Sequence, residues 1–281
     1  MSPDPPLAVI AWPFDQGIPD HGMGAGASML ASDMGLHDVL ADAGWAPTLE
    51  RVAAPDPSLG EVARTFDLLR AHAVAVRGAA SRGAFPLVLA GGCISAAATV
   101  AGCGARGVVW LDAHADYDTP QDNLSGNLDV MALSIATGRA WQAAAATIPG
   151  FRAVREDAVA LLYARDLADH QRDAVAASGL HTDPAALPLL GDDLYLHIDL
   201  DALDVSVGHA NRYAARGGPS LEELLATIDA TFACATVRAV ALTAYEPEYD
   251  RGHRIGAVAR EIAAHVARRA LTQRGTARGR S

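Results

Sequence analysis

Apolar residues are distributed along the chain in two alternating ways. Short continuous runs are typical of strands buried on both faces of a parallel sheet. They predict strands at 7–12, 86–90, 107–112, 159–164, 194–198 and 237–244. The segments between them have apolar residues near every third or fourth position, which is the period of a helix. This spacing predicts helices at 27–43, 61–81, 129–137, 141–147, 169–178, 220–232 and 255–271, and an alanine-rich helix that ends near Gly102.

The order of these elements, strand then helix repeated, indicates the fold class. Such a repeat places parallel strands in one sheet, with helices on both of its faces. We therefore predict an α/β fold with a doubly wound, mostly parallel sheet. No Pro/Gly/Ser-rich linker or repeat of fixed period interrupts the chain, so residues 1–281 are expected to form one domain, with a frayed basic tail from about residue 272.

The composition limits the classes of function that the chain can have. Its 281 residues are 51% hydrophobic, which is enough for one large α/β domain, and its net charge is −11. This acidity disfavours general binding of nucleic acid or anionic membranes, and it would attract a small cationic substrate. No apolar run reaches the roughly 20 residues that span a bilayer. The N-terminus lacks the basic start of a signal peptide, and three cysteines are too few for a disulfide framework, so a cytoplasmic location is expected.

Candidate chemistry begins where the predicted strand at 107–112 ends. Asp112, His114 and Asp116 lie two residues apart, so an extended chain projects the three side chains to one side. Two carboxylates and an imidazole that face the same way suit a divalent metal ion with oxygen and nitrogen ligands. The alternative is an acidic loop after a buried strand, in which His114 is only hydrogen-bonded to a neighbour.

Two other predicted strands also end in residues that could bind a metal ion. Cys93 follows the strand at 86–90, and Asp199 and Asp201 follow the strand at 194–198. The carboxyl ends of parallel strands meet at one edge of a sheet, where such sheets bind ligands. The three groups are therefore expected to converge there, beside the polar loop at 118–127.

The glycine-rich segment at 22–26 has a different pattern. It resembles a phosphate-binding turn, but it lacks the third glycine and the acidic residue of a dinucleotide site. We interpret it as a tight backbone turn, and a nucleotide-binding oxidoreductase is set aside.

Two aspartate motifs connect the chain to a known family. Asp112-Ala113-His114-Ala115-Asp116 and the segment 197–204, which reads His-Ile-Asp-Leu-Asp-Ala-Leu-Asp, resemble the signatures of the ureohydrolases arginase, agmatinase and formiminoglutamase. The resemblance extends from Met23 to Pro247. It implies a three-layer α/β/α, arginase-like fold. It also implies hydrolysis of a guanidinium or related group at two divalent metal ions, of which manganese is the expected one.

The same resemblance assigns a set of metal ligands. It implies that Asp112 and Asp199 bridge both ions, that Cys93 and Asp116 complete one site, and that His114 and Asp201 complete the other. Cys93 stands where the family motif Gly-Gly-Asp-His-Ser has its histidine, as in the subgroup that includes the hydroxyarginine hydrolase of D-cycloserine biosynthesis. A thiolate is a softer ligand than imidazole and would favour another metal such as zinc, unless Cys93 is a small buried residue without a metal contact.

The resemblance also assigns contacts to the substrate. Asp118, Ser125 and Asn127 occupy positions that contact the amino-acid end of the substrate in arginase. Asp129 replaces a proton-shuttling histidine. Ala244 replaces the glutamate that pairs with the guanidinium, and Glu246 nearby could substitute for it. Since the carboxylate of Asp118 would repel a substrate carboxylate, a decarboxylated or differently oriented substrate stays open.

These residues predict a mechanism. Two cations that share one water lower its pKa and supply hydroxide near neutral pH. Asp116 would orient the hydroxide, and Asp129 would help to protonate the leaving amine. The expected enzyme is an amidinohydrolase that converts arginine or N-omega-hydroxyarginine into urea or hydroxyurea plus ornithine.

Other functions fit the same residues. Agmatine, a guanidino acid or a formiminoglutamate-like compound is an alternative substrate. A catalytically silent homologue that binds metal and a ligand or partner is the alternative class. In either class the expected partner is a small guanidino-type molecule, and the chain could form a homo-oligomer.

Overall fold

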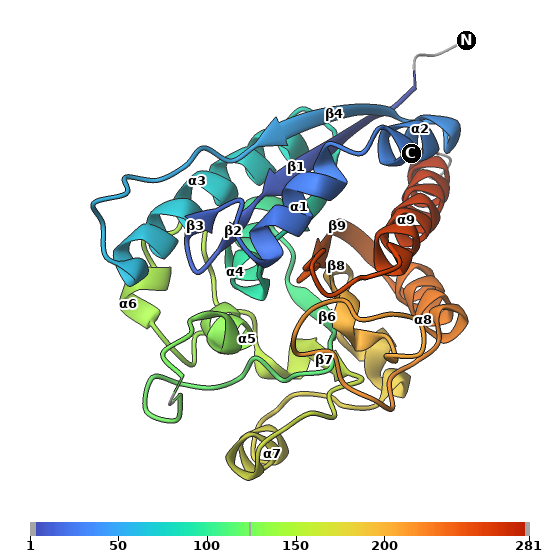
Figure 1. Ribbon diagram of the computed structural model, residues 1–281. Helices are drawn as coiled ribbons and strands as arrows, with labels where there is room; N and C mark the ends of the chain where they lie inside the picture. Colours follow the sequence, from blue (N-terminus) through green and yellow to red (C-terminus); the bar gives the residue numbers. More distant parts are fainter. Residues whose placement is uncertain (1–3, 124, 279–281) are drawn as a thin grey trace.

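The computed structural model describes residues 4–123 and 125–278, and its centre is a parallel sheet of seven strands (Figure 1). The strands lie in the order β4-β1-β5-β9-β8-β6-β7, and all neighbouring pairs are parallel. Their bounds are β1 Pro6–Trp12, β4 Ala46–Arg51, β5 Phe85–Ala90, β6 Gly107–Leu111, β7 Val159–Leu162, β8 Asp193–Asp199 and β9 Thr236–Thr243. The predicted α/β fold with a parallel sheet is confirmed. A short antiparallel pair, β2 Phe14–Asp15 and β3 Ile18–Pro19, lies outside this sheet.

Helices cover both faces of the sheet and give the fold three layers (Figure 1). One face packs its side chains, such as Trp110 and Val88, against the helices α3 (Glu61–Ser81), α4 (Ala96–Cys103) and α5 (Ala132–Ala136). The other packs residues such as Leu89 and Leu196 against α2 (Met34–Asp42), α8 (Leu221–Cys234) and α9 (Arg254–Arg278). Because successive strand residues point to opposite faces, burial of both faces explains the continuous apolar runs.

The remaining helices are short and lie near the carboxyl edge or the periphery of the sheet. They are α1 (Met23–Ala31), α6 (Gln142–Ala145) and α7 (Asp169–Ala176), together with one-turn helices that include η1 (Cys93–Ser95), η2 (Asp129–Met131) and η5 (Leu200–Ala202). A capping box begins α8, because Ser220 and Glu223 exchange side-chain-to-backbone hydrogen bonds. Within the described ranges, none of the helices combines the length and the apolar character needed to cross a membrane.

The single helix predicted at 27–43 is wrong. The segment forms two helices, α1 and α2, and α1 already begins at Met23. The break lies at Ser32 and Asp33, where the Asp33 carboxylate accepts a hydrogen bond of 2.8 Å from the backbone N–H of Gly35 and caps α2. Apolar periodicity continues across the break, so the pattern alone could not show it.

Two other parts of the chain also differ from expectation. Strand β4 was not predicted, because it is a partly exposed edge strand that pairs only with β1 and has no continuous apolar run. Residues 272–278 are not a frayed tail, because α9 continues through Arg278, and the end of the predicted tail lies outside the described residues. The side chain of Gln273 ties this last part to β9 through hydrogen bonds of 2.9 and 3.1 Å to the backbone N–H and carbonyl of Val237.

The glycine-rich segment brings α1 against the loops that follow β5 and β9. Gly22 makes a bend with a φ of +51°, as a tight turn requires, but residues 23–26 are the first turn of α1. A Cβ on Gly91 would lie 2.6 Å from the Cα of Gly24, and a Cβ on Gly26 would lie 1.8 Å from the carbonyl oxygen of Tyr245. The glycines therefore permit close backbone packing beside the loop that carries Cys93.

We expect Gly26→Ala to lower the free energy of unfolding by about 1–3 kcal/mol, because the added methyl group overpacks the contact with Tyr245. Gly275→Ala is the control: nothing lies within 4 Å of its added Cβ, and alanine is the better helix former, so a gain of up to about 1 kcal/mol is expected. Denaturant unfolding measures both changes. A Gly26 variant as stable as the parent would contradict the close packing, and an unaffected Gly275 variant would contradict the helical end of α9.

Candidate metal centre

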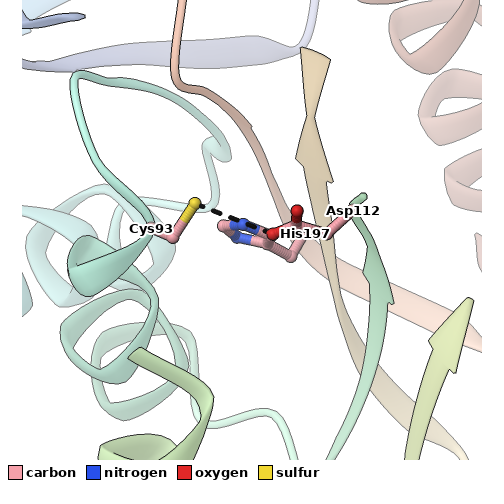
Figure 2. Close-up of side chains that lie close together, drawn as sticks. All are labelled: Cys93, Asp112 and His197. Carbon is pink, nitrogen blue, oxygen red and sulfur yellow. Dashed lines mark hydrogen bonds between the residues drawn. The ribbon is translucent and has the colours of Figure 1, made fainter. Parts of the chain in front are cut away.

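Two groups of metal-ligand side chains lie together at the carboxyl edge of the sheet. One group is Cys93, Asp112 and His197, and the other is Asp112, His114 and Asp201. In each group the ligand atoms lie within 4.8 Å of one another. Figure 2 shows the first group, in which Cys93 comes from the turn after β5 and points toward Asp112 at the end of β6.

The carboxylate of Asp112 belongs to both groups and turns one oxygen to each. Its Oδ1 is 3.3 Å from Nδ1 of His114 and accepts the backbone N–H of that residue at 2.7 Å. Its Oδ2 is 4.0 Å from Sγ of Cys93 and accepts a hydrogen bond of 3.0 Å from Nε1 of Trp110. Asp112 is thus placed to bridge two ions.

The two aspartates after β8 face the same groups. Oδ2 of Asp199 accepts hydrogen bonds from Sγ of Cys93 at 3.0 Å and from Oγ1 of Thr243 at 3.2 Å. Oδ2 of Asp201 lies 3.4 Å from Nδ1 of His114 and accepts Nδ2 of Asn211 at 3.0 Å. Asp199 therefore lies on the Cys93 side and Asp201 on the His114 side, and the convergence expected from the three strand ends is present.

Asp116 is buried beside these groups, although it is a member of neither. Its φ of +47° is unusual for a residue other than glycine, and its carbonyl accepts the backbone N–H of Leu133 at 2.9 Å, which fixes the bend. Burial and the neighbouring carboxylates of Asp112 and Asp129 raise its pKa well above the usual value.

The electrostatics of the cluster call for positive charge. Burial, together with the charge of Asp201, raises the pKa of Asp112 to about 6, and burial with the same neighbour raises the pKa of Asp199 well above its usual value. Burial alone would lower the pKa of His114, but hydrogen bonds to Asp112 and Asp201 outweigh it and raise this pKa to about 12. Buried carboxylates that resist ionisation would be stabilised by cations, and their oxygens, with imidazole nitrogen, are ligands that divalent manganese accepts. The residues therefore fit a pair of divalent ions.

Cys93 also needs a cation if it is to act as a thiolate. Its side chain is buried, and burial and the charge of Asp199 raise the pKa of its thiol well above the usual value. A bound metal ion would lower this pKa again, because a thiol that coordinates a metal ion loses its proton and binds as a thiolate.

Asp129 fills the space that Gly92 leaves open. Its Oδ1 accepts the backbone N–H of Ile94 at 2.8 Å, and a Cβ on Gly92 would lie 2.6 Å from that oxygen. Burial raises the pKa of Asp129 to about 7. Gly92 and Asp129 therefore depend on each other sterically, because any side chain at position 92 would collide with the Asp129 carboxylate.

Glu246 is buried and already has a cationic partner. Its Oε2 accepts a hydrogen bond of 3.0 Å from Nε of Arg212, and a second bond joins Oε1 to Nη2 of the same guanidinium. Ala244, two residues earlier, adopts a φ of +61°, and its carbonyl accepts Nδ2 of Asn211 at 3.0 Å. The carboxylate of Glu246, the candidate partner of the substrate guanidinium, is therefore already paired with the guanidinium of Arg212.

The residues predicted to contact the substrate make local hydrogen bonds. Asp118 is buried and accepts Nε2 of Gln171 at 3.0 Å, with Nε2 of His170 at 3.3 Å. The hydroxyl of Ser125 accepts the backbone N–H of Asn127 at 3.1 Å, and Oδ1 of Asn127 accepts the backbone N–H of Asp129 at 3.0 Å. These side chains shape the loop that leads to Asp129, and their contact with substrate stays a prediction.

Several residues around the cluster were not predicted as site residues. His197 had a signal, because it lies two residues before Asp199 on a strand and therefore points to the same face. Asn211 had none, since it reaches Asp201 from the irregular loop at 205–219. Arg165, at the end of β7, holds this loop: its guanidinium donates hydrogen bonds of 2.9–3.3 Å to the carbonyls of Tyr163, Asp201, Ala202, Leu203, Ala215 and Arg216.

A parallel α/β sheet with two ligand groups that share a carboxylate is the architecture expected of a hydrolase with a two-metal site. The chain belongs to the arginase family, whose family model matches residues 6–272. The family and the hydrolase class predicted from the aspartate motifs are confirmed: the chain is an arginase-family amidinohydrolase.

Individual relatives are distant in sequence and similar in fold. The chain is 24% identical to the arginase of Bacillus subtilis (strain 168) over 288 residues, which covers 92% of this chain and 96% of that protein. It is 30% identical to the arginase of Eremothecium gossypii over 180 residues, 55% of this chain and 45% of that one. Its fold matches a crystal structure of the Bacillus subtilis arginase with a TM-score of 0.80 at 22% identity, covering 93% and 98% of the two chains. A putative agmatinase from Clostridium difficile matches with a TM-score of 0.71 at 14% identity, covering 95% and 97%.

We expect the metal-free protein to lose stability as the pH rises from about 6.5 to about 8. The pKa values of Asp129 (about 7) and His114 (about 12) lie above their usual values, so the native state holds protons that the unfolded state has lost, and stability falls with pH. His72 and His197, whose pKa values burial lowers to about 3, have the opposite effect, which fades as the pH rises past 6.5, where unfolded histidines lose their protons.

Thermal unfolding in a chelator at the two ends of this pH range measures the slope. Saturating Mn²⁺ should reduce it, because the cations replace the protons, and Asp129→Asn should reduce it without metal. A metal-free protein whose melting temperature rises over this range would contradict the arrangement of charges.

Proposed function

We propose that this chain is a dinuclear-metal amidinohydrolase that cleaves the guanidino group of arginine or N-omega-hydroxyarginine to urea or hydroxyurea plus ornithine. The observation that carries the proposal is the buried Asp112 carboxylate, shared by two ligand groups at the carboxyl edge of an arginase-family sheet. Relatives named arginase, and an agmatinase among the proteins of similar fold, support a substrate of the guanidino class.

The proposal assigns the ligands by position. Asp112 and Asp199 would bridge two divalent ions, with Cys93 and Asp116 on one side and His114 and Asp201 on the other; manganese is the expected metal. When bound, such ions lower the pKa of a shared water, so that hydroxide is available near neutral pH.

The chain's own residues would then move the protons. Hydrolysis joins the water oxygen to the amidine carbon, breaks a C–N bond and delivers a proton to the departing nitrogen. Asp116, buried against the cluster, would accept a hydrogen bond from the attacking hydroxide and orient it. Asp129, whose Oδ1 accepts the backbone N–H of Ile94 in the turn that carries Cys93, would give the proton to the leaving amine.

Two observations bear on the choice of substrate. Arg212 neutralises Glu246, so a strongly basic guanidinium would have to displace a guanidinium already in place. The electron-withdrawing hydroxyl makes a hydroxyguanidine a weaker base than a guanidine, which favours N-omega-hydroxyarginine. Cys93 at the first ligand position favours the same substrate. The buried carboxylate of Asp118, in contrast, favours agmatine, which has no carboxylate to repel.

The metal-loaded protein is expected to release urea or hydroxyurea from at least one member of a panel of arginine, N-omega-hydroxyarginine, agmatine and short guanidino acids, read by mass spectrometry. Asp112→Asn should reduce kcat/KM by at least about a thousandfold, because it replaces the shared charged ligand by a neutral one, while the melting temperature of the metal-free protein should change little. Asp169→Asn, the same substitution at an exposed aspartate on α7 that pairs with Arg172, is the control and should keep parental activity.

A loaded protein that holds two ions and leaves the whole panel intact would refute the proposed activity and favour the silent homologue. Equal activity of the Asp112 and Asp169 variants would show that the shared carboxylate has no part in turnover.

A further inference from the structure

We infer that His197 supplies a nitrogen ligand to the ion beside Cys93, and that this position of the metal pair therefore selects a thiophilic ion such as zinc over manganese. The inference rests on the proposed metal-dependent function and adds a ligand that the aspartate motifs do not include.

The position of His197 on its strand directs its ring to the site. His197 and Asp199 are two residues apart on β8, so both point to the face that carries Cys93. On the neighbouring strand β6, Trp110 is the register partner of His197, and the two rings stack with centroids 3.7 Å apart at 15°. Stacking covers a face of the imidazole and leaves its nitrogen-bearing edge free to bind.

The hydrogen bonds of the ring distinguish its two nitrogens. Nδ1 lies 2.9 Å from the hydroxyl of Tyr195, a full hydrogen bond. Nε2 has only a long contact of 3.4 Å to Oγ1 of Thr243. Metal-binding histidines commonly use one nitrogen for the metal while an outer partner fixes the other. Tyr195 is placed as that partner, which leaves Nε2 for the ion.

Nε2 of His197 and the thiol of Cys93 lie close together, because both contact the hydroxyl of Thr243. Sγ of Cys93 is also 3.4 Å from Oγ1 of Thr243, and the ligand atoms of Cys93, Asp112 and His197 lie within 4.8 Å of one another. Figure 2 shows the ring of His197 beside the line that joins the sulfur of Cys93 to the Asp112 carboxylate. All three side chains are buried, so an ion here would be held away from solvent.

The two ligand groups differ in chemistry. One group offers a sulfur, a nitrogen and an oxygen ligand, from Cys93, His197 and Asp112. The other offers one nitrogen ligand, from His114, and oxygen ligands from Asp112 and Asp201. Thiolate with imidazole is a ligand set that zinc prefers, and a set richer in carboxylate suits manganese. The sequence motif accounts for the thiol alone; the fold adds the imidazole from the adjacent strand.

Titration of the metal-free protein with Co²⁺, a spectroscopic stand-in for zinc, tests the ligands directly. The parent should develop a sulfur-to-cobalt absorption band in the near ultraviolet with the first equivalent, and Cys93→Ser should abolish it. His197→Asn should keep the band but shift the visible bands. It should also weaken binding of the first Co²⁺ ion by more than roughly 10- to 100-fold, which is the loss expected for a residue that only orients a ligand. His72→Asn is the matched control: it alters another fully buried histidine, on α3, and should leave the titration unchanged.

Parental affinity and an unshifted spectrum in His197→Asn would overturn the inference. If that variant does not fold, X-ray absorption of the parent with one equivalent of zinc decides: sulfur plus imidazole scattering is expected, and sulfur with oxygen alone overturns the assignment. These readouts are independent of turnover. If the parent releases urea but His197→Asn changes neither the Co²⁺ affinity nor the visible bands, only the inference is refuted. If both change, and the parent binds two ions without turnover, only the proposed function is refuted.

Discussion

The structure depends on a concentration of negative charge that a folded chain does not tolerate without compensation. Four aspartates, Asp112, Asp116, Asp199 and Asp201, are buried at one edge of the sheet, with His114 as the nearby basic group. Burial and mutual repulsion make most of them poor acids, and only a pair of cations would let all of them ionise together. The remaining features, from the bend at Asp116 to the network of carbonyls around Arg165, hold these carboxylates where the cations would lie.

Parallel topology is what brings the cluster together. Strands β5, β9, β8 and β6 are consecutive in the sheet, so residues separated by more than a hundred positions meet at their carboxyl ends. Cys93 lies 3.0 Å from Asp199 because the turn after β5 faces the end of β8 across β9. Close packing of α1 through Gly24 and Gly26 supports the same edge from the side. The site is a consequence of strand order together with a few close approaches.

The sequence predicted six of the seven strands of the main sheet and the meeting of the Cys93, Asp112 and Asp199 segments at one edge, because each rests on a local pattern. Apolar runs identify strands buried on both faces, and a spacing of two residues identifies side chains that share a face. Expectations that needed contacts distant in sequence were less successful. No local pattern in the sequence indicates that Arg212 pairs with Glu246 or that Asp129 occupies the space beside Gly92. The continuation of the last helix past residue 272 is likewise not indicated by its apolar spacing. His197 was visible in the motif, but its place in the site depends on the ring stack with a neighbouring strand.

The central claim is that the shared carboxylate of Asp112 organises a centre for two ions. Elemental analysis of the metal-reconstituted, gel-filtered protein, beside the same measurement on Asp112→Asn, tests it most directly. We expect two ions per chain in the parent, and either none or one weakly held ion in the variant. A parent that retains fewer than two ions, or a variant that retains the full pair, would contradict it.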